Sequence, residues 1–462
     1  MGPMTPPWAA LARAIDGDVL LHGSPDHERR GPAFNARYDD LRPEAIVRCT
    51  TPEDVAETIR FLARHGLAHA IRSGGHSFAG HSSTRGVLVD VGGLRAVAVA
   101  AGSVRVGAGT PLGHLYERLD RHGVTVAGGT CPEVGIAGLA LGGGLGTLGR
   151  AHGTTSDQLL GAEIVLADGR IIDCDDHRDP DLFWALRGAG AGSFGVVTAL
   201  ELATVAAPAA TSFHLAWPRA SAAAVVDAWQ RWAPAGPDEL AASLKVTSGG
   251  DPDTPPSVDL YGTIFGPASD ADSVLGPLVD PVGTDPASAT RRHTSHPGTR
   301  AFWAALGDPG ARPYLRARSE FFARPLPPEA IESLLRAFTL PRPSGESREL
   351  DFTPWGGAYN RRDPGATAFV HRDAQFLLKH AVATASPAVA GADRGRRWLD
   401  ASWASVHPWG SGRAFQNFAD PDLPDWPIAY YGANLSRLAR IKARYDPTDF
   451  FHHPQSIPMV PA

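Results

Sequence analysis

The stretch IRSGGHSFAG, residues 71–80, constrains this chain more than any other segment. It places His76 among glycines and serines, whereas a histidine needed only for packing belongs on a helix face or a strand. Glycines on both sides let the backbone itself approach another group closely. The preceding residues, AHAIR, have the pattern of a short strand. The segment therefore predicts a glycine loop at the end of a strand that presents an imidazole to a bound group.

A second glycine-rich stretch follows at residues 128–150, GGTCPEVGIAGLALGGGLGTLGR. Backbone N–H groups freed by successive glycines form a concavity that suits a pyrophosphate. Gly144, Gly146 and Gly149 also match G-x-G-x-x-G, with Asp168 further along. That fingerprint requires an uninterrupted strand directly before the motif and a helix that begins within it. Glycines precede it here, and Asp168 is better used in an Asp-Gly hairpin turn, so we do not interpret the stretch as a Rossmann unit.

The chain has three cysteines, too few for a disulfide framework, which favours a reducing compartment. Cys49 and Cys174 are interpreted as small buried hydrophobic residues. Cys131 differs because turn formers flank it and nearby N–H groups can stabilise its thiolate. A metal site of His76 with Cys131 is not supported, since no further ligands follow at zinc-like spacing. We assign no metal.

A length of 462 residues exceeds what one hydrophobic core usually serves, so two domains are expected. Thr51-Pro52-Glu53-Asp54 begins a helix that runs to about Gly66. Short helices and strands mix up to about residue 205, which indicates an α+β fold. A boundary is expected at 206–211. Beyond it we expect a helix near 219–233, strands near 240–248 and 257–265, and a C-terminal helix carrying Tyr431, Leu435, Leu438 and Ile441 that Asp446-Pro447 ends.

The charge balance excludes some functions. A net charge of −6 gives no reason to bind nucleic acid or anionic lipid. The N-terminus has no signal-peptide pattern, and no apolar run reaches membrane-spanning length. We expect a cytoplasmic protein with a small-molecule substrate, and the sequence carries no signal for its oligomeric state.

The Arg-Ser-Gly-Gly-His loop, Cys131 located 55 residues after His76, and the ending YYGANLSRLARIKARYDPTDFFHHPQSIP together resemble one family. This is the berberine-bridge-enzyme-like group of the vanillyl-alcohol-oxidase/PCMH superfamily of flavoproteins. The resemblance extends from about residue 38 to 458. It implies a PCMH-type FAD-binding domain of two α/β subdomains (1–207), a substrate domain with an antiparallel sheet covered by helices (208–409), and a C-terminal segment (410–462) that returns to the first domain.

The resemblance implies FAD held by two covalent bonds, through His76 to the 8α-methyl carbon and through Cys131 to C6. Both groups must act as nucleophiles, which requires a neutral imidazole and a thiolate. The remaining cofactor-binding residues fall into three groups along the FAD. The implied set is Arg72, Ser73, Gly74, Gly75 and Ser77 from the first loop, Gly135, Gly138, Gly142 and Gly146 from the second, and Gly195, Val196 and Val197 along the adenosine half.

The chain departs from the family at the catalytic base. Many relatives carry a tyrosine in a Tyr-x-Asn motif, where this chain has Phe415-Gln416-Asn417. Trp355 stands where some relatives have a second tyrosine. By strand alternation Tyr359 is expected to share a face with Trp355 and is the candidate replacement base. The weaker candidates are His371 and Glu320, and for each of the three a purely structural role is the simpler interpretation. Asn417 keeps the family position and is expected to contact flavin or substrate.

Trp355 and Phe415 suggest an apolar cover suited to an aromatic or polycyclic ligand. The leading hypothesis is an FAD-dependent oxidase or dehydrogenase that acts on a bulky secondary metabolite, as in antibiotic biosynthesis. O2 is the expected electron acceptor. Without the tyrosine base, dehydrogenation at a C–H bond or an oxidative cyclisation becomes an alternative to alcohol oxidation. The alternatives are a sugar or oligosaccharide oxidase, flavin serving as structure or as an oxygen-transferring species during a cyclisation, and a flavin-bearing binding or resistance protein.

Overall fold

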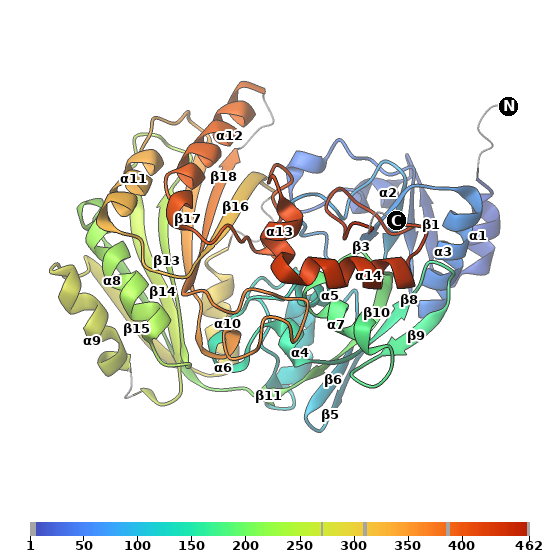
Figure 1. The fold of residues 1–462 in the computed structure, drawn as a ribbon, viewed down its shortest axis with the longest axis horizontal. Helices are drawn as coiled ribbons and strands as arrows, with labels where there is room; N and C mark the ends of the chain where they lie inside the picture. Colours follow the sequence, from blue (N-terminus) through green and yellow to red (C-terminus); the bar gives the residue numbers. More distant parts are fainter. Residues whose placement is uncertain (1–5, 269–270, 308–311, 385–388, 460–462) are drawn as a thin grey trace.

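The computed structural model describes residues 6–268, 271–307, 312–384 and 389–459, with the side chains of 389–392 excepted. Figure 1 shows two lobes, one containing the strands β1 (Asp18–Leu21) to β11 (Val205–Ala206) of the N-terminal region and one built on the large sheet of the middle region. The C-terminal helices return from the second lobe to lie against the first.

The first sheet carries the His76 loop. Its order is β1-β2-β4-β3, in which β2, β4 and β3 run parallel and β1 is antiparallel to β2. The strands are β1 (Asp18–Leu21), β2 (Ala45–Arg48), β3 (His69–Arg72) and β4 (Val87–Asp90). Because parallel strands end at one edge, the loop after β3 lies at the carboxyl edge, where open α/β sheets bind ligands.

A second, wholly antiparallel sheet has the order β5-β6-β10-β8-β9. Its strands are β5 (Val97–Ala100), β6 (Ser103–Gly107), β8 (Leu159–Val165), β9 (Ile171–Cys174) and β10 (Val196–Ala203). The predicted Asp168-Gly169 hairpin turn joins β8 to β9, with Gly169 at φ 78°. A small pair, β7 (Val124–Thr125) and β11 (Val205–Ala206), lies beside it.

The middle region forms a seven-stranded antiparallel sheet of order β15-β12-β14-β13-β17-β18-β16. The strands are β12 (Ala210–Trp217), β13 (Leu240–Ser248), β14 (Ser257–Phe265), β15 (Ser288–Thr294), β16 (Tyr314–Phe322), β17 (Glu346–Pro354) and β18 (Phe376–Thr384). Helices α8, α9, α11 and α12 cover the face turned away from the first lobe (Figure 1). The predicted α+β class and the helix-covered antiparallel sheet are confirmed.

The helices of the described residues vary in length, and α3 in the first lobe and α8 beside the large sheet have 14 residues each. They are α1 (Trp8–Ala14), α2 (Pro25–Arg30), α3 (Pro52–His65), α4 (Leu112–Asp120), α5 (Ile136–Leu141), α6 (Gly149–His152), α7 (Pro180–Ala189), α8 (Ala222–Ala235), α9 (Ala271–Val282), α10 (His296–Ala304), α11 (Pro328–Phe338), α12 (Val389–Ala404), α13 (Trp426–Tyr431) and α14 (Leu435–Tyr445). The 3-10 turns are η1 (Ala36–Tyr38), η2 (Thr155–Gln158), η3 (Arg219–Ser221), η5 (Gly357–Tyr359), η6 (His407–Trp409), η7 (Gln416–Phe418) and η8 (Gly432–Asn434). None of the helices that the structure describes has the length and apolar character needed to cross a bilayer.

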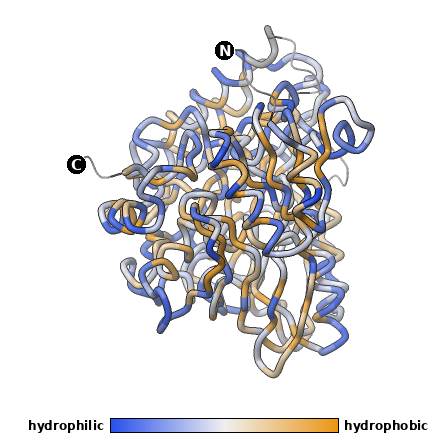
Figure 2. Tube along the Cα trace, turned by 90° about the vertical axis from the view of Figure 1, so that its right-hand side faces the viewer, coloured by the Kyte–Doolittle hydropathy of each residue, from blue (hydrophilic) through white to orange (hydrophobic). Residues whose placement is uncertain are grey.

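Each lobe has its own hydrophobic core, and the apolar segments concentrate on the inner strands in Figure 2. The C-terminal segment is tied to the first lobe by Lys442. This fully buried ammonium group donates to the carbonyl oxygens of Ser193 (2.9 Å) and Phe451 (2.7 Å) and to the carboxylate of Asp446 (2.6 Å). Helix α14 and the segment up to Phe451 therefore pack into the core of the first lobe.

Two sequence expectations are corrected. The C-terminal helix does not include Tyr431, because Gly432 adopts φ 48° and ends α13, so that α14 begins at Leu435. The strand expected to carry both Trp355 and Tyr359 ends before either residue. Strand β17 ends at Pro354, Gly356 and Gly357 take positive φ, and η5 follows, so strand alternation does not apply there.

Candidate functional site

His76 lies on the loop that follows β3, at the carboxyl edge of the parallel strands. Its ring stacks on Phe34, with centroids 4.7 Å apart and planes inclined at 21°. Burial lowers the pKa of His76, and the charge of Glu133 opposes that shift in part. The imidazole therefore stays neutral at neutral pH and keeps a lone pair for bond formation.

The backbone N–H groups of Gly74, Gly75, His76 and Ser77 donate to no acceptor among the residues that the structure describes. Gly75 has φ 74°, a conformation that turns successive N–H groups toward one side. Such a run of free donors is an anion-binding concavity. It matches the phosphate-binding role predicted for this loop.

Arg72 supports the same loop from behind. Its guanidinium donates to the carbonyl oxygens of Ser82 (2.9 Å), Arg30 (2.8 Å) and Gly31 (2.9 Å), and the side chain is buried. Because its donors are used by the protein, the geometry gives Arg72 a positioning role rather than a phosphate contact.

The second glycine stretch packs directly against the first. A Cβ atom added to Gly74 would collide with the backbone nitrogen of Gly135, and one added to Gly135 would collide with Oγ of Ser73. That hydroxyl donates to the carbonyl oxygen of Ala108 at 2.6 Å. The close approach explains why both loops need glycine here, and it brings Cys131 and His76 to the wall of one cavity.

This cavity has a volume of about 1720 Å³ and extends from the glycine loops to the large sheet. Most of the predicted site residues line it: Ser73, Gly74, Gly75, His76, Ser77, Cys131, Gly135, Gly138, Gly146, Gly195, Val197, Tyr359, Phe415 and Asn417. Four do not, namely Arg72, Gly142, Val196 and Trp355. The predicted cofactor residues are thus largely brought together.

The three cysteines differ in their surroundings as expected. Burial raises the pKa of Cys49 and of Cys174 to about 12, so these thiols stay protonated and inert. Cys131 is free and exposed to the cavity. The free N–H donors, the glycine cradle, the neutral imidazole and the accessible thiol fit an FAD held at both His76 and Cys131.

The opposite wall of the cavity is a charged face of the large sheet. Along β13 and β17 buried and half-buried residues alternate, so Lys245 and Asp351 point to the cavity while their neighbours pack under the helices. The register pairs Lys245 with Asp351 and Asp351 with Lys379 of β18. These three side chains therefore form one row across three strands.

Four ion pairs hold this row. Nζ of Lys379 lies 3.3 Å from Asp351 and 3.0 Å from Glu349, and Nζ of Lys245 lies 3.0 Å from Glu349 and 3.8 Å from Asp351. Burial works against the charge of both lysines, but the two carboxylates outweigh it and raise the pKa of each. Oδ1 of Asp351 has no hydrogen-bond partner among the described residues.

Aromatic contacts connect this row to the His76 loop. Nζ of Lys379 lies 5.1 Å from the ring centre of Phe418. That ring stacks on Phe78, two residues after His76, at 5.4 Å and 13°. The charged face therefore lies near the end of the cavity at which His76 would hold the flavin.

Tyr359 contributes to structure. Its side chain is 1% exposed, its ring stacks on Trp355 at 4.1 Å, and its hydroxyl donates to the carbonyl oxygen of Gly146 at 3.2 Å. Burial is the main cause that raises the pKa of Tyr359 far above its ordinary value. A phenol so resistant to ionisation is a poor general base.

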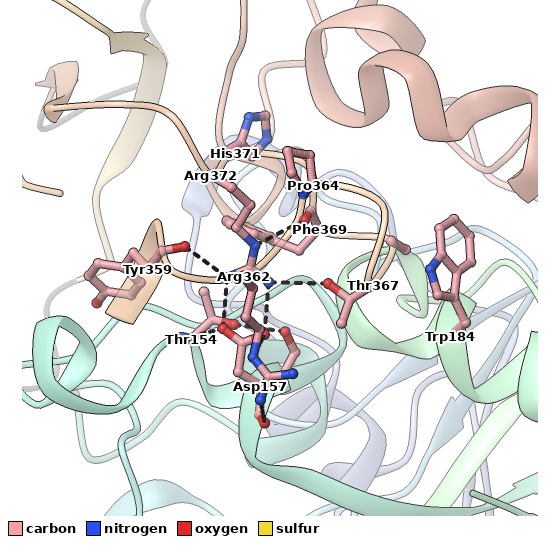
Figure 3. Close-up of polar contacts among 12 residues, drawn as sticks. Thr154, Asp157, Trp184, Tyr359, Arg362, Pro364, Thr367, Phe369, His371 and Arg372 are labelled. Atoms are coloured by element: carbon pink, nitrogen blue, oxygen red, sulfur yellow. Dashed lines mark hydrogen bonds and ion pairs between the residues drawn. The ribbon is translucent and has the colours of Figure 1, made fainter. Parts of the chain in front are cut away.

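The segment after Tyr359 is fixed by a buried ion pair between the lobes (Figure 3). Nη1 and Nη2 of Arg372 each lie 2.7 Å from the carboxylate of Asp157 in η2, and Nη1 also donates to the backbone oxygen of Tyr359 at 3.2 Å. Burial raises the pKa of Asp157, but the hydrogen bond and charge of Arg372 outweigh it, so the net shift is downward.

The other candidate bases lie outside the cavity. His371 is fully buried and its Nε2 donates to Oε1 of Gln416 at 3.2 Å, and burial lowers the pKa of His371 to about 3. Glu320 is 1% exposed and accepts from His407 (2.8 Å) and from the N–H of Gly412 (2.9 Å). Glu320 therefore lies buried in the edge strand β16 and does not reach the cavity.

Asn417 and Phe415 lie on the cavity wall next to the second glycine stretch. Nδ2 of Asn417 donates to the carbonyl oxygen of Leu139 at 2.9 Å, and a Cβ at Gly142 would collide with its Oδ1. Trp355 is fully buried behind the wall, where its Nε1 donates to the carbonyl oxygen of His371 at 3.1 Å. Phe415 thus lines the cavity, and Trp355 supports it from outside.

The charged row was not predicted from the sequence. Its signal was present as charges set between apolar residues of the strands, in SLKVTS, RELDFTP and FLLKHAV. It was also present in composition, because the chain has only three lysines and two of them meet here. Their convergence depends on strand order, which the sequence did not reveal.

Comparison with known proteins agrees with this site. Residues 43–175 match the FAD binding domain model, and residues 414–458 match the model described as berberine and berberine like. The chain is 31% identical over 462 residues to chitooligosaccharide oxidase of Gibberella zeae, covering 94% of this chain and 91% of that protein. It is 30% identical over 455 residues to an uncharacterised FAD-linked oxidoreductase, YgaK, of Bacillus subtilis, covering 96% and 97%.

Among solved structures, BBE-like 1 of Physcomitrella patens superposes with a TM-score of 0.90 at 28% identity, covering 98% of this chain and 99% of that one. Fold and site define the chain as an FAD-linked oxidoreductase with a PCMH-type FAD-binding domain. More particularly, it belongs to the berberine-bridge-enzyme-like family.

Proposed function

We propose that this protein is an oxidase whose FAD is bound covalently to His76 and Cys131, and that it oxidises an alcohol carbon of a hydroxyl-rich substrate such as an oligosaccharide. The observation that carries the substrate class is the row of Lys245, Asp351 and Lys379 facing the glycine loops. Charged groups in a cavity wall suit a ligand with many hydroxyls. The similarity to a chitooligosaccharide oxidase supports the same choice.

We assign the general base to Asp351. It lines the cavity, its Oδ1 is buried and has no hydrogen-bond partner among the described residues, and Lys379 holds its other oxygen at 3.3 Å. The bound FAD supplies the hydride acceptor. Asp351 would accept the proton of the substrate hydroxyl while the carbon gives up its hydride, so that the alcohol loses one proton and one hydride in total and becomes a carbonyl. O2 is the proposed acceptor that regenerates the oxidised cofactor.

A second substrate class is favoured by a different part of the wall. Phe415, Phe418 and Trp303 also line the cavity, and such rings suit an aromatic or polycyclic metabolite. In that case a dehydrogenation at an activated C–H bond or an oxidative cyclisation would replace alcohol oxidation, as the lost tyrosine suggested.

The test is flavin bleaching in the absence of air, followed by absorbance. One panel contains oligosaccharides of different sugars and linkages, and the other contains aromatic alcohols and polycyclic metabolites. The proposal expects stoichiometric bleaching by a member of the sugar panel, and peroxide release when air is admitted. Bleaching by the aromatic panel alone would replace the substrate class. A ligand that binds tightly without bleaching would favour a binding or resistance protein.

A further inference from the structure

We propose that His22, His27 and Glu28 form a binding site for a divalent metal ion of the zinc type, apart from the flavin cavity. His22 follows β1, and His27 and Glu28 lie in α2. Their donor atoms all lie within 4.8 Å of one another. Oε1 of Glu28 is 3.5 Å from Nδ1 of His27 and 3.9 Å from Nδ1 of His22.

The hydrogen bond on the far side of His27 fixes its tautomer. Nε2 lies 2.8 Å from the carbonyl oxygen of Pro43, which can only accept, so Nε2 carries a proton. In the neutral ring Nδ1 then holds a lone pair. His27 is 1% exposed, and its Nδ1 has no hydrogen-bond partner among the described residues.

This buried lone pair faces an oxygen of the exposed Glu28 carboxylate, so two acceptors oppose each other across 3.5 Å. A cation between them, either a second proton on His27 or a metal ion, would make the contact favourable. The third donor favours the metal. Nδ1 of His22 turns toward the same carboxylate oxygen, an arrangement that a protonated His27 does not require.

The donor set is the one that zinc uses, with two imidazole nitrogens and one carboxylate oxygen. Its supporting contacts also fit. The carbonyl of Pro43 orients His27, and Nη1 of Arg42 donates to Oε2 of Glu28 at 2.6 Å, which leaves Oε1 for the metal. Three protein ligands leave a fourth position for water.

The site would act on stability rather than on the reaction. Helix α2 leads into Arg30 and Gly31, whose carbonyl oxygens accept from Arg72, and then to Phe34, which stacks on His76. A metal ion at residues 22–28 would therefore stabilise the segment that packs against the His76 loop.

The test is isothermal titration of ZnCl2 into the flavin-loaded, tag-free full chain after treatment with a chelator. One ion should bind per chain, and zinc should raise the melting temperature. His22→Gln should weaken binding at least about tenfold and abolish the shift in melting temperature. His22 is an exposed side chain, so this variant should fold. Glu28→Gln should have the same effect, whereas His114→Gln, an exposed histidine of α4, should bind like the unmodified chain.

Absence of stoichiometric binding would overturn the proposal, as would binding that His22→Gln and Glu28→Gln leave intact. Nitrogen chemical shifts give an independent readout. If both ring nitrogens of His27 are protonated at pH 7.5 and zinc does not change them, the cation is a proton and the metal site is rejected.

Discussion

At the scale of single residues, Asp351 carries the proposed chemistry and Tyr359 does not. Asp351→Asn keeps the size of the side chain but removes the proton acceptor. It should lower the rate of flavin reduction by about 10²–10⁴-fold without releasing the flavin. Stopped-flow absorbance under anaerobic conditions measures this rate. Asp259→Asn is the matched control, because Asp259 pairs with His214 on the same sheet but outside the cavity wall. Equal rates in Asp351→Asn and the unmodified enzyme would remove Asp351 from the mechanism.

Tyr359→Phe should leave flavin reduction within about twofold of the unmodified rate. It should lower the free energy of unfolding by about 1 kcal/mol, since the carbonyl of Gly146 loses its donor. Denaturant unfolding and anaerobic kinetics on the same sample separate the two effects. A large loss of rate with unchanged stability would restore Tyr359 as the base.

At the scale of elements, the two glycine loops depend on their close approach. Gly74→Ala places a methyl group against the backbone of Gly135 and should cost about 1–3 kcal/mol of stability, with reduced FAD incorporation. The control is Gly276→Ala in α9, where an added Cβ meets nothing within 4 Å and helix propensity should make the change neutral or stabilising. Full flavin content in Gly74→Ala would argue that the loops separate easily.

The ion pair between Arg372 and Asp157 joins η2 to the segment before β18. Arg372→Met leaves the buried carboxylate of Asp157 with only the half-exposed Arg362, at 3.3 Å, as a counter-charge and should lower the free energy of unfolding by about 3 kcal/mol at pH 7. The exposed pair of Arg361 and Asp238 is the control, since Arg361→Met should change stability by about 1 kcal/mol or less.

The ion pair of Arg372 and Asp157 also makes the stability of the protein depend on pH. Because the folded-state pKa of Asp157 is lowered, its contribution is fully present above the unfolded value of about 3.9 and is lost as the pH falls through the folded value. Arg372→Met should therefore show a weaker loss of stability between pH 5 and acid than the unmodified chain. Parallel acid-unfolding curves for the two would contradict this assignment.

Elements with a clear local signal were predictable. The bounds 240–248 and 257–265 agree with β13 and β14, and the capping box of Thr51 and Asp54 begins α3 as expected. The predicted bounds of a helix or strand were wrong where a glycine with positive φ interrupts the hydrophobic pattern. Gly356 and Gly357 end the strand pattern before Tyr359, and Gly432 separates Tyr431 from α14.

At the scale of the whole molecule, the cavity is built from segments that are far apart in the sequence. The end of the cavity that would hold the FAD was predictable from the sequence, because each glycine loop is a motif of consecutive residues. The substrate end joins β13, β17 and β18 with η7 of the C-terminal segment, and only the strand order brings them together. The domain division at residues 207 and 409 and the cytoplasmic location stay predictions.

The double tether is the central claim, and mass spectrometry of peptides from the denatured protein tests it most directly. We predict that the peptide containing His76 and the peptide containing Cys131 are recovered as one species joined through a single FAD, and that His76→Ala and Cys131→Ala each leave FAD on the other peptide. Recovery of the His76 peptide at its unmodified mass from the unaltered chain would contradict the account.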